Sequence, residues 1–398
     1  MTVPADSPES GLAAVCSAVD KTGAVGFLQV DRGDTPSRRY LTRYPGPDRE
    51  TAILVVPASD TDRPQAIYCV PSDVTAPAER FERVDDGIDR EVVGRHPSIT
   101  VGQHACEVLA AHLGERAGSG KLLVPRDLPH DTALFCQQAG YELQSTGVVR
   151  AGRTSKTDAE RDCLQAVQQA AIDGMARAEA VLAASNHDSG LLFEGRPLTV
   201  ERLRREINTK LASIGVSPAD NTQISASAIE STDQLPVGEP LCIHLAPRGP
   251  HGYHAHLTRT FVVDSDGGWE RRAAVAAEAG LRAATRQLEP GVDVSAVEGE
   301  IVAEIGAYGF AVAAEPETNS RPRATATVHG VGLSTHERPT PATTSTIRAG
   351  SVLAIEAGVV DSMEGTIQLG ALWAVTPDRN IRLAASSSSL TPTNSDPT

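Results

Sequence analysis

The sequence predicts an α/β protein of two domains followed by a short tail. Its 398 residues exceed one average domain and allow a large core. Up to about residue 152, short apolar runs alternate with turn residues, whereas from Thr157 onward apolar residues recur at helical spacing. We therefore expect one domain over residues 1–152, a second over 153–384, and a disordered tail rich in Ser, Thr and Pro over 385–398.

Apolar periodicity gives the expected elements of each domain. In the first domain, the pattern predicts strands over 26–30, 52–57, 66–71 and 122–124 and a helix over 101–113. In the second domain, Thr157 and Glu160 form a capping box that starts a long helix. The other elements expected there are a helix from Thr199 to Gly215, a hairpin over about 240–264, two helices over about 269–308, and strands over about 324–384.

Charge and composition exclude several classes of partner. The chain carries 36 Lys and Arg against 51 Asp and Glu, a net charge of −15. Such a surface repels nucleic acid and anionic membranes, so we expect neither as a partner. The acidic excess, with only four Lys, resembles proteins of organisms that keep molar salt in the cytoplasm. The six cysteines are scattered without a C-x-x-C pair, which indicates reduced thiols and a cytoplasmic location.

Histidines gather around the predicted hairpin. If the hairpin folds symmetrically about Pro250, His244 and His256 lie opposite each other, six residues on either side. His254 would share the face of His256, because side chains two apart on a strand point the same way. Converging imidazoles suit a metal. The alternative for His254, and for His251 in the turn, is a solvated surface position, which we favour for these two.

A second group of titratable residues follows, consisting of His329, His336, Glu337 and Glu356. Glycines on both sides of His329 indicate backbone packed closely around a site. Glu356 interrupts an apolar run and needs a partner if it is buried, so a structural salt bridge is its alternative role.

The order of these motifs resembles the pita-bread metallopeptidases, the branch of Xaa-Pro aminopeptidase, prolidase and creatinase. The resemblance rests on His329-Gly-Val-Gly-Leu-x-x-His336-Glu337-x-Pro339, then Ile355-Glu356-x-Gly358, preceded by Gly252-Tyr253-x-x-x-Leu257-Thr258-Arg259-Thr260-Phe261. It implies a creatinase-type N-terminal α/β domain followed by a pita-bread α+β domain, a peptide or small amide as ligand, and a homodimer.

The resemblance also implies a two-metal site, and this chain departs from it. Active relatives hold two divalent metals with two Asp, one His and two Glu, and these positions fall on His244, His256, His329, Glu356 and Gly370. The Arg that usually lies two residues before the last Glu falls on Gln368. The Pro-His that usually lies upstream is missing from 224–233, where Ser231, Thr232 and Asp233 stand instead. With one carboxylate left, two dications would remain largely uncompensated, so we expect no dinuclear centre.

Two interpretations of the remaining residues stay open. His244, His256, His329 and Glu356 hold at most one divalent transition metal (Zn, Fe, Ni, Mn or Co), or they hydrogen-bond one another without metal. His336, with Glu337 beside it, is the candidate acid or base.

Three functions correspond to these interpretations. The leading hypothesis is a non-catalytic or altered paralogue that binds peptide N-termini or small amides. The alternatives are a hydrolase using one metal and a metal-free hydrolase similar to creatinase.

Overall fold

The computed structural model describes residues 11–58, 63–74, 81, 87–187, 190–226, 234–312, 322–341 and 346–393. It divides into two compact units, Met1–Arg153 and Thr154–Thr398, one residue beyond the expected boundary. None of the described helices is long and apolar enough to cross a membrane.

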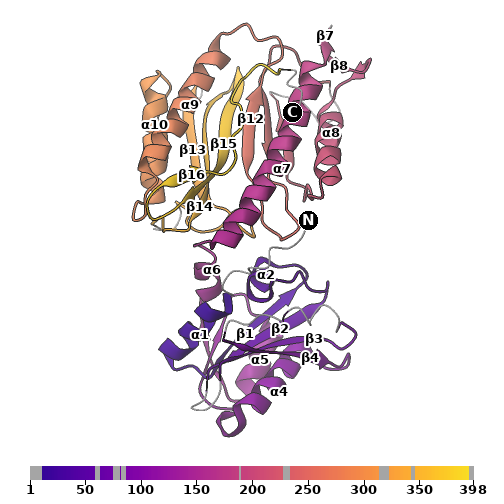
Figure 1. Cartoon of the computed structure of the whole chain (residues 1–398), viewed down its shortest axis with the longest axis vertical. Coiled ribbons are helices and arrows are strands. Elements are labelled where there is room, and N and C mark those ends of the chain that lie inside the picture. The colour runs from indigo at the N-terminus through magenta and orange to yellow at the C-terminus, as the bar shows by residue number, and fades with distance from the viewer. Residues whose placement is uncertain are drawn as a thin grey trace. The chain divides into compact units, whose positions relative to one another are not determined.

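The first unit is built on a six-stranded mixed sheet (Figure 1). β1 pairs antiparallel with β2 and parallel with β5, so the strands run in both directions. In spatial order they are β4 (Asp89–Arg95), β3 (Gln65–Pro71), β2 (Glu50–Val56), β1 (Gly26–Arg32), β5 (Lys121–Val124) and β6 (Glu142–Ser145). The strands expected from the sequence are all present, because their apolar runs fill the core.

Five α-helices are described in the first unit: α1 (Gly11–Thr22), α2 (Pro36–Thr42), α4 (Val101–Leu113), α5 (His130–Gln138) and α6 (Val148–Gly152). The predicted helix over 101–113 is confirmed as α4, which begins where the Thr100 side chain accepts a hydrogen bond from the Gln103 backbone. Val101, Ala105 and Leu109 of α4 pack on the strands.

The second unit is built on a seven-stranded sheet in which β15 lies centrally, between β12 and β14. Its strands are, in spatial order, β10 (Thr222–Ser225), β11 (Leu241–Leu245), β12 (Leu257–Phe261), β15 (Gly365–Val375), β14 (Val352–Asp361) and β13 (Arg323–Gly330), with β16 (Asn380–Arg382) also paired to β15. A small sheet of β7 (Asn186–His187), β8 (Leu191–Phe193) and β9 (Arg196–Pro197) lies outside it.

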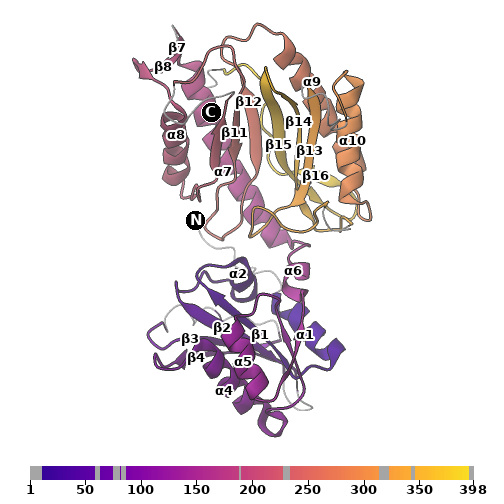
Figure 2. The same cartoon turned by 180° about the vertical axis from the view of Figure 1, so that it is seen from behind.

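Among the described residues, four helices accompany this sheet: α7 (Asp158–Ala183), α8 (Val200–Ser213), α9 (Trp269–Gln287) and α10 (Val294–Ala307). The capping box of Thr157 and Glu160 is confirmed at the start of α7. Viewed from behind, the strands lie in front of α7, and α9 and α10 lie beside β13 and β14 (Figure 2).

Strand alternation separates the two faces of this sheet. On β14, Leu353, Ile355, Ala357 and Val359 belong to the core that includes Ala276 of α9. Glu356 therefore points to the other face, since successive strand residues alternate. On β15, the core residues are Ile367 and Ala371, so Gln368 and Gly370 lie on the other face, the one that carries Glu356.

The predicted register of the hairpin is wrong. His244 pairs with Thr258, not with His256. The hairpin is centred on His251, one residue beyond Pro250, because the Gly249 amide donates to the Tyr253 carbonyl inside the turn. The second strand accordingly begins at Leu257, and His256 lies just before it.

The expectation of a disordered tail does not hold for residues 385–393. The Arg259 guanidinium donates to the Ser389 carbonyl at 3.0 Å, and the Val262 amide donates to the Leu390 carbonyl at 2.9 Å. The Thr393 hydroxyl donates to Glu179 of α7 at 3.1 Å. The composition of the tail predicted disorder because it carries no information about hydrogen-bond partners that lie more than 80 residues earlier in the chain. Residues 394–398 lie outside the described part.

Candidate functional site

A cavity of about 880 Å³ lies on the sheet face that carries Glu356. It gathers side chains from β10 to β15 and from α8. Its lining includes His244, His256, His329, His336, Glu356, Gln368, Thr258, Thr327, Asn208, Gln223, Ser225, Arg204 and Asp220. The structure thus brings together in one cavity the four histidines and the glutamate that the sequence singled out. Ser231, Thr232 and Asp233 lie outside the described residues.

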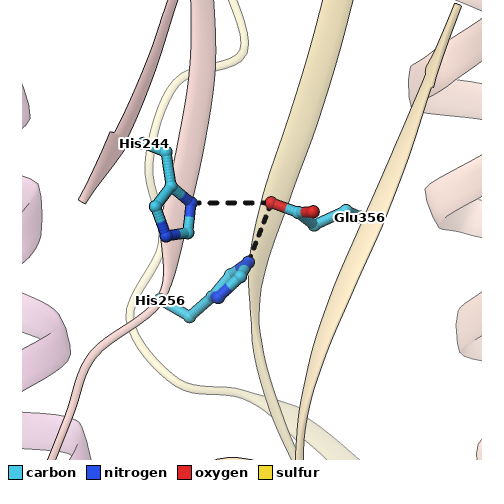
Figure 3. A group of neighbouring side chains, drawn as sticks. All are labelled: His244, His256 and Glu356. Carbon is cyan, nitrogen blue, oxygen red and sulfur yellow. Dashed lines mark hydrogen bonds and ion pairs between the residues drawn. The ribbon is translucent and has the colours of Figure 1, made fainter. Parts of the chain in front are cut away.

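Glu356 is the centre of this group. Its Oε1 accepts a hydrogen bond from His256 Nε2 at 2.9 Å, and His244 Nδ1 lies 3.6 Å from the same oxygen (Figure 3). The Thr258 hydroxyl also donates to this oxygen, at 2.5 Å. Its Oε2 accepts a bond from the Gln368 amide at 2.9 Å. The carboxylate thereby accepts hydrogen bonds from β12, from β15 and from the residue before β12.

Gly370 makes this arrangement possible. It pairs with Glu356 on one side and with Thr258 on the other, so it lies between them in the sheet. A Cβ at Gly370 would lie 2.8 Å from Glu356 Cγ and 3.3 Å from Thr258 Cβ. The Thr258 and Glu356 side chains therefore meet across a central strand only because that strand has no side chain at this position.

The histidines on the β11–β12 side are held by hydrogen bonds. His244 Nδ1 lies 2.9 Å from the Thr258 hydroxyl, and because that hydroxyl gives its one proton to Glu356, His244 is the donor. His256 has no ladder partner, but the buried Gln168 amide of α7 bonds both its N–H and its carbonyl at 3.0 Å. The His244 and His256 rings meet edge to face at 4.7 Å.

His329 and His336 continue the row of rings. The His329 ring lies 5.4 Å from that of His256 and stacks on that of His336 at 4.0 Å. The expected close backbone is present, since a Cβ on Gly330 would lie 2.2 Å from the Arg338 carbonyl oxygen. His336 is the exposed end of the row, where it can reach a ligand in the cavity.

Glu337 is buried in the loop that also carries His336. Its carboxylate forms an ion pair with Lys156 at 3.1 Å, and both side chains are buried. It also accepts a bond from the Ser334 amide at 3.0 Å. Through these two contacts Glu337 fixes the loop that carries His336.

Burial and hydrogen bonding set the charges of the cavity. Burial alone would raise the pKa of Glu356, but the neighbouring His244 and the hydrogen bonds from His256 and Thr258 lower it well below its usual range. Burial lowers the pKa of His329 to about 4, and the neighbouring His256 adds to this. Burial also lowers the pKa of His256. At neutral pH the His256 and His329 rings are therefore neutral, and Glu356 is a carboxylate.

These residues do not fit a two-metal centre. Only Glu356 supplies a carboxylate among the five family positions, and Gly370 offers no side chain and leaves a space that Glu356 fills. A single metal has a compatible ligand set, because ligand atoms of His244, His256 and Glu356 lie within 4.8 Å of one another. Such binding would require His256 Nε2 to give up the proton it donates to Glu356.

Two other histidines singled out from the sequence, His251 and His254, are not among the residues that line the cavity. His251 is exposed, as expected, whereas His254 is buried and not solvated. Its Nδ1 lies 3.2 Å from the Ala246 carbonyl and its amide donates to Gly332, so it joins the turn to the His336 loop. The surface assignment failed for His254 because the eleven residues between β11 and β12 fold back on themselves.

Three residues of the site were not predicted from the sequence as functional. Thr258 carries a weak signal, since it lies two residues after His256 and inside the quoted motif. Gln168 and Lys156 carry none, because their partners lie 88 and 181 residues away in the chain.

Comparison with known proteins confirms the expected pita-bread fold. Residues 201–377 match the model of metallopeptidase family M24. The matched stretch lies within the second unit, and this part of the chain is similar to family M24. No curated protein sequence matches the chain.

Solved structures of peptidases share the fold over nearly the whole chain. The Xaa-Pro dipeptidase from Bacillus anthracis is 17% identical with a TM-score of 0.74, and the match covers 96% of this chain and 98% of that one. The prolidase from Pyrococcus horikoshii OT3 is 18% identical with a TM-score of 0.72, covering 96% and 99%. Dipeptidase PepE from Mycobacterium ulcerans is 21% identical with a TM-score of 0.71, covering 96% and 97%.

Proposed function

We propose that this cavity binds a peptide N-terminus or a small amide and does not hydrolyse it. The observation that carries the proposal is the bond between Thr258 and Glu356 across Gly370. This bond occupies Glu356 Oε1, the oxygen that a bridging metal would need. The Thr258 and Glu356 side chains also fill the space beside Gly370 that a second carboxylate would need. With the two-metal site absent, the ordinary route to an activated water in this family is lost.

The lining of the cavity supports a peptide-like ligand. Threonine, serine, asparagine and glutamine side chains offer donors and acceptors that match amide groups. The exposed His336 lies at the end of the ring stack and can bond a ligand carbonyl or amine. The names of the structural neighbours make peptides with proline at the second position the first ligands to test.

Calorimetry and a proline-release assay test the proposal together. The full chain, dialysed against Mn or Co and measured in high salt, should bind Ala-Pro or Ala-Pro-Ala saturably and release no proline. His336→Ala should weaken binding, and His251→Ala, which changes an equally exposed histidine of the turn, should not. Rapid metal-dependent release of proline, or no binding of any dipeptide or amide, would contradict the proposal.

One observation favours a second candidate, a hydrolase with a single metal. The ligand atoms of His244, His256 and Glu356 are close enough to hold one ion, and His336 is placed to move a proton. In that case metal and activity should disappear together in His244→Ala. The metal-free creatinase-like reaction has no support here, because the resemblance requires a Glu where Gly370 stands. The homodimer stays a prediction.

A further inference from the structure

Two buried thiols meet inside the first unit. Cys106 of α4 and Cys136 of α5 have their Sγ atoms 3.3 Å apart. Both belong to the core between the helices and the sheet, together with Leu109 and Tyr141. A hydrogen-bonded thiol pair needs an inward movement of little more than 1 Å to reach the S–S distance of about 2.05 Å.

The two helix backbones approach closely enough for a bond. One helical turn before the cysteines, Gly102 of α4 lies against Thr132 of α5, and a Cβ on Gly102 would lie only 2.7 Å from Thr132 Cα. Cys106 and Cys136 are each four residues further along, on the same faces of these helices. The glycine thus allows the close packing that brings the two thiols together.

The two cysteines differ in access and acidity. Cys106 is 7% exposed and Cys136 is fully buried. The hydrogen bond from Cys136 lowers the pKa of Cys106, whereas the same bond and burial raise the pKa of Cys136. Cys106 is therefore the attacking thiolate and Cys136 the resolving thiol.

We propose that Cys106 and Cys136 form a reversible disulfide by exchange with a low-molecular-weight disulfide. The Cys106 thiolate attacks one sulfur of that disulfide, and the first small thiolate leaves. Cys136 then loses its proton to that thiolate and attacks Cys106 Sγ, which breaks the mixed disulfide and releases the second small thiol. Two protein thiols are oxidised, and one disulfide is reduced to two thiols.

The proposal is tested by incubating the folded full chain with oxidised glutathione, alkylating it, and mapping its peptides. The expected result is the loss of two of the six thiols and a peptide pair linking Cys106 to Cys136, reversed by dithiothreitol. Because the bond closes a 30-residue loop, the oxidised protein should also unfold at higher denaturant concentration.

Three variants separate the pair from general thiol oxidation. Cys136→Ala should leave glutathione attached to Cys106, and Cys106→Ala should abolish both products. Cys69→Ala is the matched control, because Cys69 lies in the same core and burial raises its pKa to about 12, so linkage should persist. A stable glutathione adduct on wild-type Cys106, linkage only after denaturation, or no reaction in the folded protein would each overturn the proposal.

Discussion

Replacing Gly370 with alanine is the sharpest perturbation of the site, because one added carbon separates Thr258 from Glu356. The new Cβ would lie 2.8 Å from Glu356 Cγ and 3.2 Å from Oε1. The Glu356 side chain cannot move away freely, because its backbone is part of β14 and its Oε2 accepts a hydrogen bond from Gln368. The 2.5 Å bond between Thr258 and Glu356 should break.

The expected cost has three parts. Losing a hydrogen bond to a buried carboxylate costs about 1.5–3 kcal/mol. Crowding the packed site adds about 1–3 kcal/mol. Alanine in a strand interior returns about 0.5–1 kcal/mol relative to glycine. The free energy of unfolding should therefore fall by roughly 2–5 kcal/mol.

Urea denaturation of Gly370→Ala, Thr258→Val and the double variant measures this. If Gly370 serves the bond, the double variant should cost less than the sum of the single ones by about 1.5–3 kcal/mol. Gly299→Ala on the exposed side of α10, where a Cβ meets nothing within 4 Å, is the control and should stabilise slightly. Additive effects within about 0.5 kcal/mol would refute the reasoning.

Two further predictions concern buried charge. Lys156→Met should lower the free energy of unfolding by about 3–5 kcal/mol, because it removes the cation from the buried Glu337 carboxylate. Adding Glu337→Leu should recover part of this loss. Denaturation curves that show no recovery would argue against a stabilising ion pair. The pKa of His329 is lowered to about 4 in the folded chain, whereas an ordinary histidine has a pKa of about 6.5. Between these two pH values His329 takes up a proton in the unfolded chain but not in the folded chain. Stability should thus fall by on the order of 3 kcal/mol as pH drops from 6.5 to 4 and stay constant above, and His329→Asn should flatten a denaturation series over this range.

The sequence predicted the frame of the site well because its motifs are local. His329, His336 and Glu356 lie on segments whose strand pattern and glycines specify the backbone around them. For Glu356, the sequence predicted only the need for a partner if it is buried; in the structure, strand alternation turns it toward polar groups although its neighbours in the chain are apolar.

What the sequence could not give is the pairing between distant segments. A one-residue difference in the hairpin centre moved the partner of His244 from His256 to Thr258, because register depends on the turn as well as on the strands. Glu337 was assigned by its neighbour in sequence, whereas its buried partner Lys156 lies in the segment before α7. The tail was misjudged for the same reason.

The metal content of the folded protein tests most directly whether the two-metal centre has been lost. The full chain is dialysed against Mn, Co or Zn in high salt, freed of loosely held ions, and its metal is measured by elemental analysis per chain. With Glu356 as the one carboxylate and Gly370 in place of the last, we predict at most one tightly bound ion per chain. Two tightly bound ions per chain would contradict the loss of the dinuclear site.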